Sequence, residues 1–175
     1  MPRVRLSLVQ PGIDHTFRFI RPDGRVDAID AVRLRATVDF SGSVLTGLPS
    51  TWPAYPDCVL DTGSHLTTVP ERLHRYFKPG VVTWLPFDPS MRADLRRLTI
   101  GGGVFTYALG EIAIRLRDRW GGSLDVSVVA QFVRDGGTLQ LPLLLGLRGG
   151  LLEGRTLKAE PDANSPYGQS WILEE

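Results

Sequence analysis

From residue 32 to residue 40 the chain reads Val-Arg-Leu-Arg-Ala-Thr-Val-Asp-Phe, a regular alternation of apolar and polar side chains. Successive side chains of a β-strand point to opposite faces, so this period of two is typical of a strand with one buried face. Segments 4–8, 16–20, 110–116 and 124–129 repeat the pattern. The chain is also divided into short pieces by 19 glycines and 13 prolines, as expected of strands joined by many turns. We therefore predict an all-β fold.

Helical signals are few. Residues 70–77 begin with Pro-Glu and stop before Pro79-Gly80, which favours one short helix. We expect a second short helical turn at residues 147–153, after Gly146. The polar stretch 161–168 predicts a loop, and residues 170–174 predict a last strand.

Composition limits the protein class. A chain of 175 residues with 42% hydrophobic and 22% charged residues suits one globular domain. The net charge is +1 and no run of five like charges occurs, so we do not expect a nucleic-acid partner. The longest apolar stretch, 139–147, is too short for a membrane span. With Cys58 as its one cysteine and no apolar run at its start, the chain is expected to be a soluble cytoplasmic protein.

One segment carries chemistry. The apolar strand 58–60 runs directly into Asp61-Thr62-Gly63-Ser64. A carboxylate at a buried strand end is costly unless it is paired or hydrogen-bonded. Gly63 permits a tight turn, and the hydroxyls of Thr62 and Ser64 can form hydrogen bonds around the acid. The four residues are thus suited to present one carboxylate in a semi-buried site.

Peptide hydrolysis by carboxylates needs two acids that share one proton, one to activate a water and one to polarise the carbonyl. The chain has a single Asp-Thr/Ser-Gly sequence, because residues 39–42 contain an intervening Phe and residues 135–137 lack a hydroxyl. One carboxylate per chain predicts a homodimer with Asp61 of each copy at the two-fold axis.

The segment 61–64, followed by Thr-Thr-Val-Pro at residues 67–70, resembles the active-site turn of the retropepsin-like aspartic proteases, the family of the retroviral proteases and their bacterial relatives. A second similarity is the Leu-Leu-Leu-Gly sequence at residues 143–146, which in the family packs behind the catalytic turn and leads into a short helix. Leu144, Leu145 and Gly146 would fill that role.

A third similarity lies between these two segments. Residues 100–110 look like the tip and returning strand of the family's flap, the hairpin that closes over substrate, with Gly101, Gly102 and Gly103 at the tip. The stretch 81–98, with two prolines and three arginines, does not look like a simple flap strand. The resemblance covers about residues 57–152, preceded by a strand-rich extension.

The resemblance implies a fold and an activity. Residues 1–175 would form a single retropepsin-like domain, a closed, barrel-like β lobe with one or two short helices that works as a homodimer. It would be an aspartic endopeptidase that cleaves polypeptide substrates at Asp61 without a metal or organic cofactor. Thr62 would form a hydrogen bond across the dimer axis, and Gly63 and Ser64 would support the turn.

Other interpretations stay open. Ser64 either contacts the carboxylate or braces the turn. Residues 101–103 form a mobile hairpin tip or a plain loop, and a phosphate loop is disfavoured because a strand-like sequence follows. The terminal strands either pair across a dimer axis or are edge strands of one subunit. The rival functions are a non-catalytic dimeric peptide-binding domain of the same fold and an unrelated β-barrel that binds a small ligand.

Overall fold

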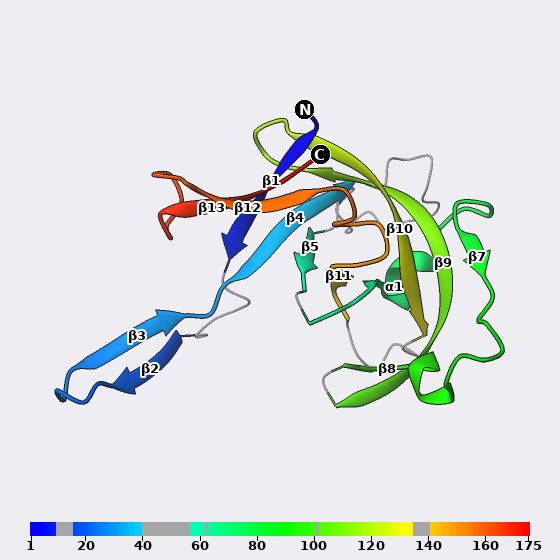
Figure 1. Ribbon diagram of the computed structural model, residues 1–175, viewed down its shortest axis with the longest axis horizontal. Coiled ribbons are helices and arrows are strands. Elements are labelled where there is room, and N and C mark those ends of the chain that lie inside the picture. Colours follow the sequence, from blue (N-terminus) through cyan, green and yellow to red (C-terminus); the bar gives the residue numbers. More distant parts are fainter. Residues whose placement is uncertain (10–15, 40–56, 62, 101, 135–140) are drawn as a thin grey trace.

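A computed structural model describes residues 1–9, 16–39, 57–61, 63–100, 102–134 and 141–175 of the chain (Figure 1). Most of these residues lie in β-strands and few lie in helices, which confirms the predicted all-β class. In these ranges no helix is long and apolar enough to cross a membrane.

Most strands are short, and the two longest, β9 and β10, extend along much of the sheet. The strands are β1 (Arg3–Val9), β2 (Thr16–Ile20), β3 (Val26–Asp30), β4 (Arg33–Asp39), β5 (Asp57–Leu60), β6 (Thr67–Val69), β7 (Thr83–Leu85), β8 (Arg97–Ile100), β9 (Gly103–Arg117), β10 (Ser123–Arg134), β11 (Leu143–Leu145), β12 (Thr156–Pro161) and β13 (Gln169–Glu174).

Eleven strands form one sheet in the order β12-β13-β1-β10-β6-β11-β5-β4-β9-β7, with β8 paired to β9. Further pairings of β1 with β4 and of β9 with β10 fold this sheet back on itself. In its middle, β11 runs parallel to β5 and antiparallel to β6. Asp61 follows β5 and Gly146 follows β11, so this trio of short strands positions the predicted site.

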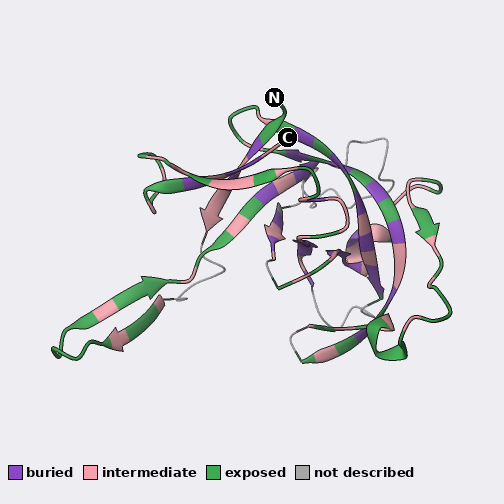
Figure 2. Cartoon of the chain, in the orientation of Figure 1, coloured by how far each residue is buried: buried purple, intermediate pink, exposed green. Residues whose placement is uncertain are grey.

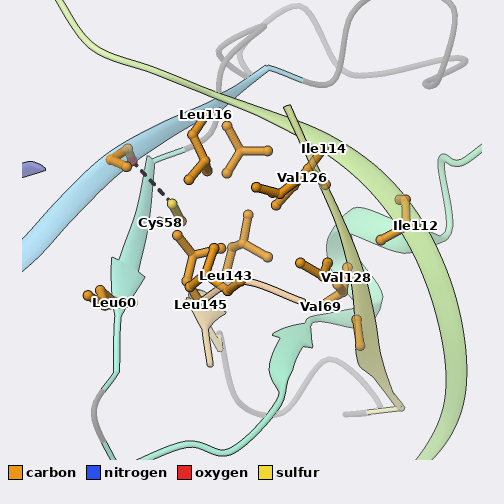
Figure 3. Packing of buried hydrophobic residues seen from close by; sticks show 14 of the residues in the cluster. Cys58, Leu60, Val69, Ile112, Ile114, Leu116, Val126, Val128, Leu143 and Leu145 are labelled. Carbon is orange, nitrogen blue, oxygen red and sulfur yellow. Dashed lines mark hydrogen bonds between the residues drawn. The ribbon is translucent and has the colours of Figure 1, made fainter. Parts of the chain in front are cut away.

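The core is built from alternate residues of the long hairpin β9–β10. In β9 the side chains of Ile112, Ile114 and Leu116 are buried while their neighbours are exposed, and β10 repeats this pattern. The period-two alternations at 110–116 and 124–129 are thereby confirmed as strands with one buried face. Figure 3 shows these side chains, together with Val126 and Val128 of β10, packed with residues from the central strands β5, β6 and β11: Cys58, Leu60, Val69, Leu143 and Leu145.

The two terminal strands pair with each other inside one subunit. β1 lies antiparallel to β13, from Arg3 opposite Glu174 to Leu6 opposite Trp171. β12, which the sequence did not predict as a strand, pairs with the other side of β13 and ends the sheet. Both terminal strands therefore have neighbours on both sides, and the expectation that they are edge strands of one subunit is wrong, because β12 covers β13 and β10 and β4 cover β1.

The helix predictions are half right. The helix α1 (Glu71–His74) lies inside the predicted range 70–77, with Pro70 as its N-cap. Residues 147–153 form turns instead of a helix, because Gly149 and Gly150 adopt φ values of 77° and 109°, outside the helical region. A 3₁₀ helix, η1 (Ala93–Arg96), lies in the stretch 81–98, which also contains β7 and the start of β8.

β2 and β3 form a separate hairpin that we call the arm (residues 16–30), in register from Thr16 opposite Asp30 to Ile20 opposite Val26. Figure 1 shows the arm extending away from the main sheet. Most of its surface is exposed (Figure 2). The sequence predicted β2 as a strand but was wrong about its buried face, since none of its residues is buried, and it missed β3.

Candidate active site

Asp61 stands at the end of β5, where two parallel strands meet. β5 and β11 pair in register, with Leu60 opposite Leu145. The Asp61 amide continues this ladder by donating to the Leu145 carbonyl oxygen at 3.0 Å. The backbone of Asp61 is therefore fixed by the sheet, and its half-buried side chain leaves the sheet at a defined point.

The carboxylate is held by the turn that follows it. The Gly63 amide donates to Asp61 Oδ1 at 3.0 Å, and the Ser64 amide donates to the Asp61 carbonyl oxygen at 3.1 Å. These two hydrogen bonds fix the position of one carboxylate oxygen relative to the end of β5.

Ser64 braces the turn. Its hydroxyl donates to the Leu66 carbonyl oxygen at 2.7 Å, and its own carbonyl oxygen accepts from the Leu147 amide at 3.1 Å. Of its two predicted roles, this conformation has the bracing one. Thr62, the other predicted support residue, lies outside the described residues.

Gly63 is exposed, and the reason for a glycine here is not found within one chain. Its φ lies outside the left-handed region, and among the described residues a Cβ added to it would meet only Asp61 Oδ1 at 3.4 Å, an ordinary contact. Glycine was expected to permit the tight turn, and the described part of the isolated subunit also has room for a side chain there.

Gly146 packs behind the turn, as the resemblance implies for this position. A Cβ on Gly146 would stand 2.2 Å from the Leu66 carbonyl carbon, a distance that real atoms do not adopt. The Gly146 amide donates to Thr67 Oγ1 at 3.3 Å, and the Arg148 amide donates to the His65 carbonyl oxygen at 2.7 Å. The segment after β11 therefore fastens the loop between β5 and β6 from behind.

Of the two leucines before Gly146, one contacts the core and the other contacts the hollow at the site. Leu145 is fully buried and packs with the core of the sheet, while Leu144 lines a hollow next to Asp61. The structure thus places all three predicted packing residues against the turn that carries Asp61.

A hairpin stands over the site. β8 and β9 pair down to Ile100 opposite Gly103, so the hairpin turns between these two residues. Gly102 has a φ of 82°, which favours glycine. A Cβ on Gly103 would stand 2.8 Å from the Phe105 ring. Gly101, the remaining predicted tip residue, lies outside the described residues.

The hairpin and Asp61 face a common hollow of about 240 Å³. Leu98, Thr99 and Ile100 of β8 form one wall, and the turn with Asp61 forms another. The other lining residues are Gly63, Ser64, His65, Leu66, Thr68, Gln131 and Leu144. The structure therefore brings the predicted turn and the predicted hairpin together, although neither Gly102 nor Gly103 lines the hollow.

A second hollow, of about 280 Å³, lies on another side of Asp61. Val32, Arg33 and Leu34 form one wall, and Val59, Leu60 and Leu144 complete its lining. Asp61 is thus accessible from two directions in the single subunit, toward the hairpin and toward the start of β4.

Thr67 and Thr68 were noted in the sequence only as part of the family resemblance, and no role was predicted for either. Both are fully buried; Thr68 is among the residues that line the hollow, and its hydroxyl has no hydrogen-bond partner among the described residues. Two threonines in a short buried strand were the signal, because a hydroxyl in an apolar environment needs a reason. Ile100 lies in the segment that the resemblance assigned to the flap, whereas Leu98 and Gln131 had no signal of their own, since only the pairing of the strands brings them to the hollow.

The remaining chemically active groups lie apart from Asp61. Cys58 is buried, which raises the pKa of its thiol to about 12, and its Sγ donates to the Ala36 carbonyl oxygen at 3.3 Å. The Nε2 of His74 lies 3.0 Å from the Val133 carbonyl oxygen, and of the two described histidines His65 is the one that lines the hollow. In the described ranges no three His, Cys, Asp or Glu side chains lie close enough together to hold a metal ion.

Comparisons of the chain with models of known protein families, with curated proteins and with solved structures found no match. The chemistry of the site must then be argued from its geometry. One hydrogen-bonded carboxylate, fixed at a strand end and facing a hollow with largely apolar walls, can act as a general base or as half of an acid pair.

Proposed function

We propose that the chain is one half of an aspartic endopeptidase, and that Asp61 from each of two copies meets at a molecular two-fold axis. The observation that carries this proposal is the shared hollow between Asp61 and the hairpin β8–β9. A carboxylate held by its own turn, with a hairpin over it, is one half of what is needed to bind and cleave an extended peptide, and a second copy would supply the other half.

The dyad would use one proton between two carboxylates. Two acids at close range cannot both ionise readily, so they titrate as a coupled pair. The ionised member takes a proton from a bound water while that water attacks the peptide carbonyl carbon, and the protonated member donates to the carbonyl oxygen. The tetrahedral intermediate then collapses, with a proton delivered to the leaving amine. No metal or organic cofactor takes part in this proposal.

The substrate would be an extended polypeptide that lies between the two subunits. Extended peptides bind largely through main-chain hydrogen bonds, while pockets select alternate side chains. The hollow beside Asp61 is lined by Leu66, Leu98, Ile100 and Leu144, so we expect it to accept an apolar substrate side chain. The hairpin β8–β9 would close over the peptide and exclude bulk water.

The strand pairings support the finer fold proposal, a closed acid-protease-like lobe. Starting at β1, the pairings run through β10, β6, β11, β5 and β4 and return to β1. A ring of paired strands is the arrangement that removes free edges from a sheet.

The test is cleavage of an unfolded protein by the full chain at pH values from 4 to 8. We expect concentration-dependent cleavage that Asp61→Asn lowers by about 10²–10⁴-fold or more, because an amide cannot act as the general base. The variant should keep the circular dichroism spectrum and the dimer mass of the parent chain.

The same experiment separates the alternative, a non-catalytic dimeric domain that binds peptides in this hollow. That domain would bind an extended peptide but show neither cleavage nor affinity for a peptide mimic with a hydroxyl in place of the scissile carbonyl. Parent protein that dimerises yet lacks both properties would reject the peptidase proposal.

A further inference from the structure

The arm exposes more apolar surface than a solvent-facing hairpin needs. Phe17 is 69% exposed, and its cross-strand partner Ile29 is 59% exposed. An isolated two-stranded hairpin is only marginally stable in water. In the described chain β2 and β3 hydrogen-bond only to each other, so the arm lacks a third strand that would support it.

The two faces of the arm differ. Residues directly opposite each other across a strand pair share a face. One face therefore carries the pair Phe17–Ile29 and, next along it, Phe19 opposite Asp27. At the far end of this face lies Arg21. Its Cζ is 5.5 Å from the centre of the Phe19 ring, and its guanidinium forms a salt bridge with the Asp27 carboxylate at 2.7 Å. We call Phe17, Phe19 and Ile29 the aromatic face.

The opposite face has a polar base. It carries Thr16, whose hydroxyl donates to Asp30 at 2.7 Å, then Arg18 opposite Ala28. Only its outer end is apolar, where Ile20 pairs with Val26. Aromatic side chains are enriched in the centres of protein interfaces and charged side chains are depleted there, so the aromatic face is the one suited to docking.

The arm leaves the body of the molecule beside Asp61. The arm follows β1 and precedes β4 in the chain. The end of β1 and the start of β4 pair with each other, with Val9 opposite Arg33. Leu34 pairs with Leu60, the residue before Asp61. Arg33 and Asp61 also line the same hollow. The base of the arm thus lies level with the catalytic strand end, and Figure 1 shows the arm projecting outward on the side of β5.

We propose that the aromatic face of the arm packs against a second copy of this chain and holds the two Asp61 turns together. This inference rests on the proposed function, because the peptidase site is incomplete with one carboxylate and must be approached by a second copy at Asp61. A projection that starts level with Asp61 extends toward that copy. The two-fold axis then makes each copy both the donor and the acceptor of an arm.

The size of the arm is adequate for this role. Aromatic side chains bury roughly 150–250 Å² each, and a stable interface buries roughly 1,200–2,000 Å² in total. Two arms bring four phenylalanines and two copies of Ile29 to the interface. The intrachain pairing of β1 with β13 uses the termini within each subunit, which leaves the arm as the projecting element available to the dimer.

The experiment compares two double variants of the full chain, each made in an Asp61→Asn background so that self-cleavage does not interfere. Phe17→Ser with Ile29→Ser removes the two most exposed side chains of the aromatic face and keeps Phe19. Ile20→Ser with Val26→Ser is the matched control, because this pair is equally exposed, lies on the same two strands and faces the other way. Sedimentation equilibrium gives the dimer dissociation constant, and circular dichroism checks the fold.

We expect the aromatic-face variant to raise the dissociation constant by about tenfold or more and the control to raise it by less than about threefold. With Asp61 restored, cleavage by the aromatic-face variant should fall at low protein concentration and recover at high concentration. This recovery would separate weakened assembly from a damaged active site.

The outcomes distinguish the two proposals. If the parent dimerises and both double variants dimerise equally well, the arm inference is wrong while the peptidase proposal stands. If the aromatic-face variant alone weakens the dimer but the parent cleaves nothing, the arm inference stands and the peptidase proposal fails. A parent chain that stays monomeric at every concentration overturns both.

Discussion

Gly146 and Leu66 touch backbone to backbone: a Cβ on Gly146 would stand 2.2 Å from the carbonyl carbon of Leu66 and 2.5 Å from its oxygen. Leu66 belongs to the loop that joins the Asp61 turn to β6, and Gly146 follows β11. The contact therefore connects two segments about eighty residues apart and sets the position of the turn from behind.

Gly146→Ala should destabilise the fold, because no flexible side chain can move aside to make room for the methyl group. Overpacking in a buried region costs about 1–3 kcal/mol, and we expect at least this loss in the free energy of unfolding measured with urea. Cleavage should fall as well, since the turn shifts with Leu66. An unchanged unfolding midpoint would mean that the two backbones are farther apart than described.

Gly63→Ala is the contrasting case. Its added methyl group meets only Asp61 Oδ1 at 3.4 Å, so subunit stability should change by less than about 0.5 kcal/mol. If two Asp61 turns approach each other at a dimer axis, that methyl group lies in their path, and dimer affinity and cleavage should both drop. Full activity in Gly63→Ala would argue against close approach of the two turns.

The fold could be predicted from the sequence wherever one strand carries its own pattern. The alternations at 4–8, 110–116 and 124–129 all became strands with a buried face, because burial of one face is written locally. β12 and β3 were missed. These two strands form because each pairs with a neighbouring strand. Neither has a buried apolar face that would appear as an alternation in the sequence.

The candidate site shows the same division. Asp61 and Gly146 were found because each follows a short apolar strand in a recognisable motif. The meeting of Asp61 with Leu98 and Ile100 depends on how β8 folds over β9, a relation between distant segments that no local pattern contains. The arm, likewise, is visible only once β2 is known to pair with β3 and with nothing else described.

Cys58 should resist alkylation in the folded protein. Burial raises the pKa of its thiol from 9.0 to about 12, so the reactive thiolate is scarce at pH 9. We expect slow reaction with iodoacetamide in buffer and fast reaction in urea, with the unfolded chain as its own control. Rapid alkylation of the folded protein would show that the strand β5 opens readily.

The same shift makes stability depend on alkaline pH. The folded-state pKa exceeds the unfolded value, so the contribution of the neutral thiol is complete below about pH 9 and is lost as the pH rises toward 12. The free energy of unfolding should fall above pH 9, at most by roughly 1.4 kcal/mol per pH unit from this group. Cys58→Ala should remove that part of the slope, and equal slopes in both proteins would contradict the burial of the thiol.

Thr67→Val should weaken the fold. The Thr67 hydroxyl oxygen is buried and accepts from the Gly146 amide at 3.3 Å, and valine would leave that amide without its partner. An unsatisfied buried donor costs about 1–3 kcal/mol, which urea unfolding can measure. The effect should resemble a milder form of Gly146→Ala, because both changes release the segment behind the turn.

Thr68→Val, one residue along the same strand, should have the opposite effect on stability and serves as the matched control for Thr67→Val. Thr68 lines the hollow beside Asp61, and its hydroxyl is buried and has no hydrogen-bond partner among the described residues. Replacing an unsatisfied hydroxyl with a methyl group of similar shape should leave stability unchanged or raise it, since the desolvation cost of the hydroxyl disappears. Urea unfolding measures the difference from the parent chain. Stability that falls as far as in Thr67→Val would show that Thr68 has a partner after all.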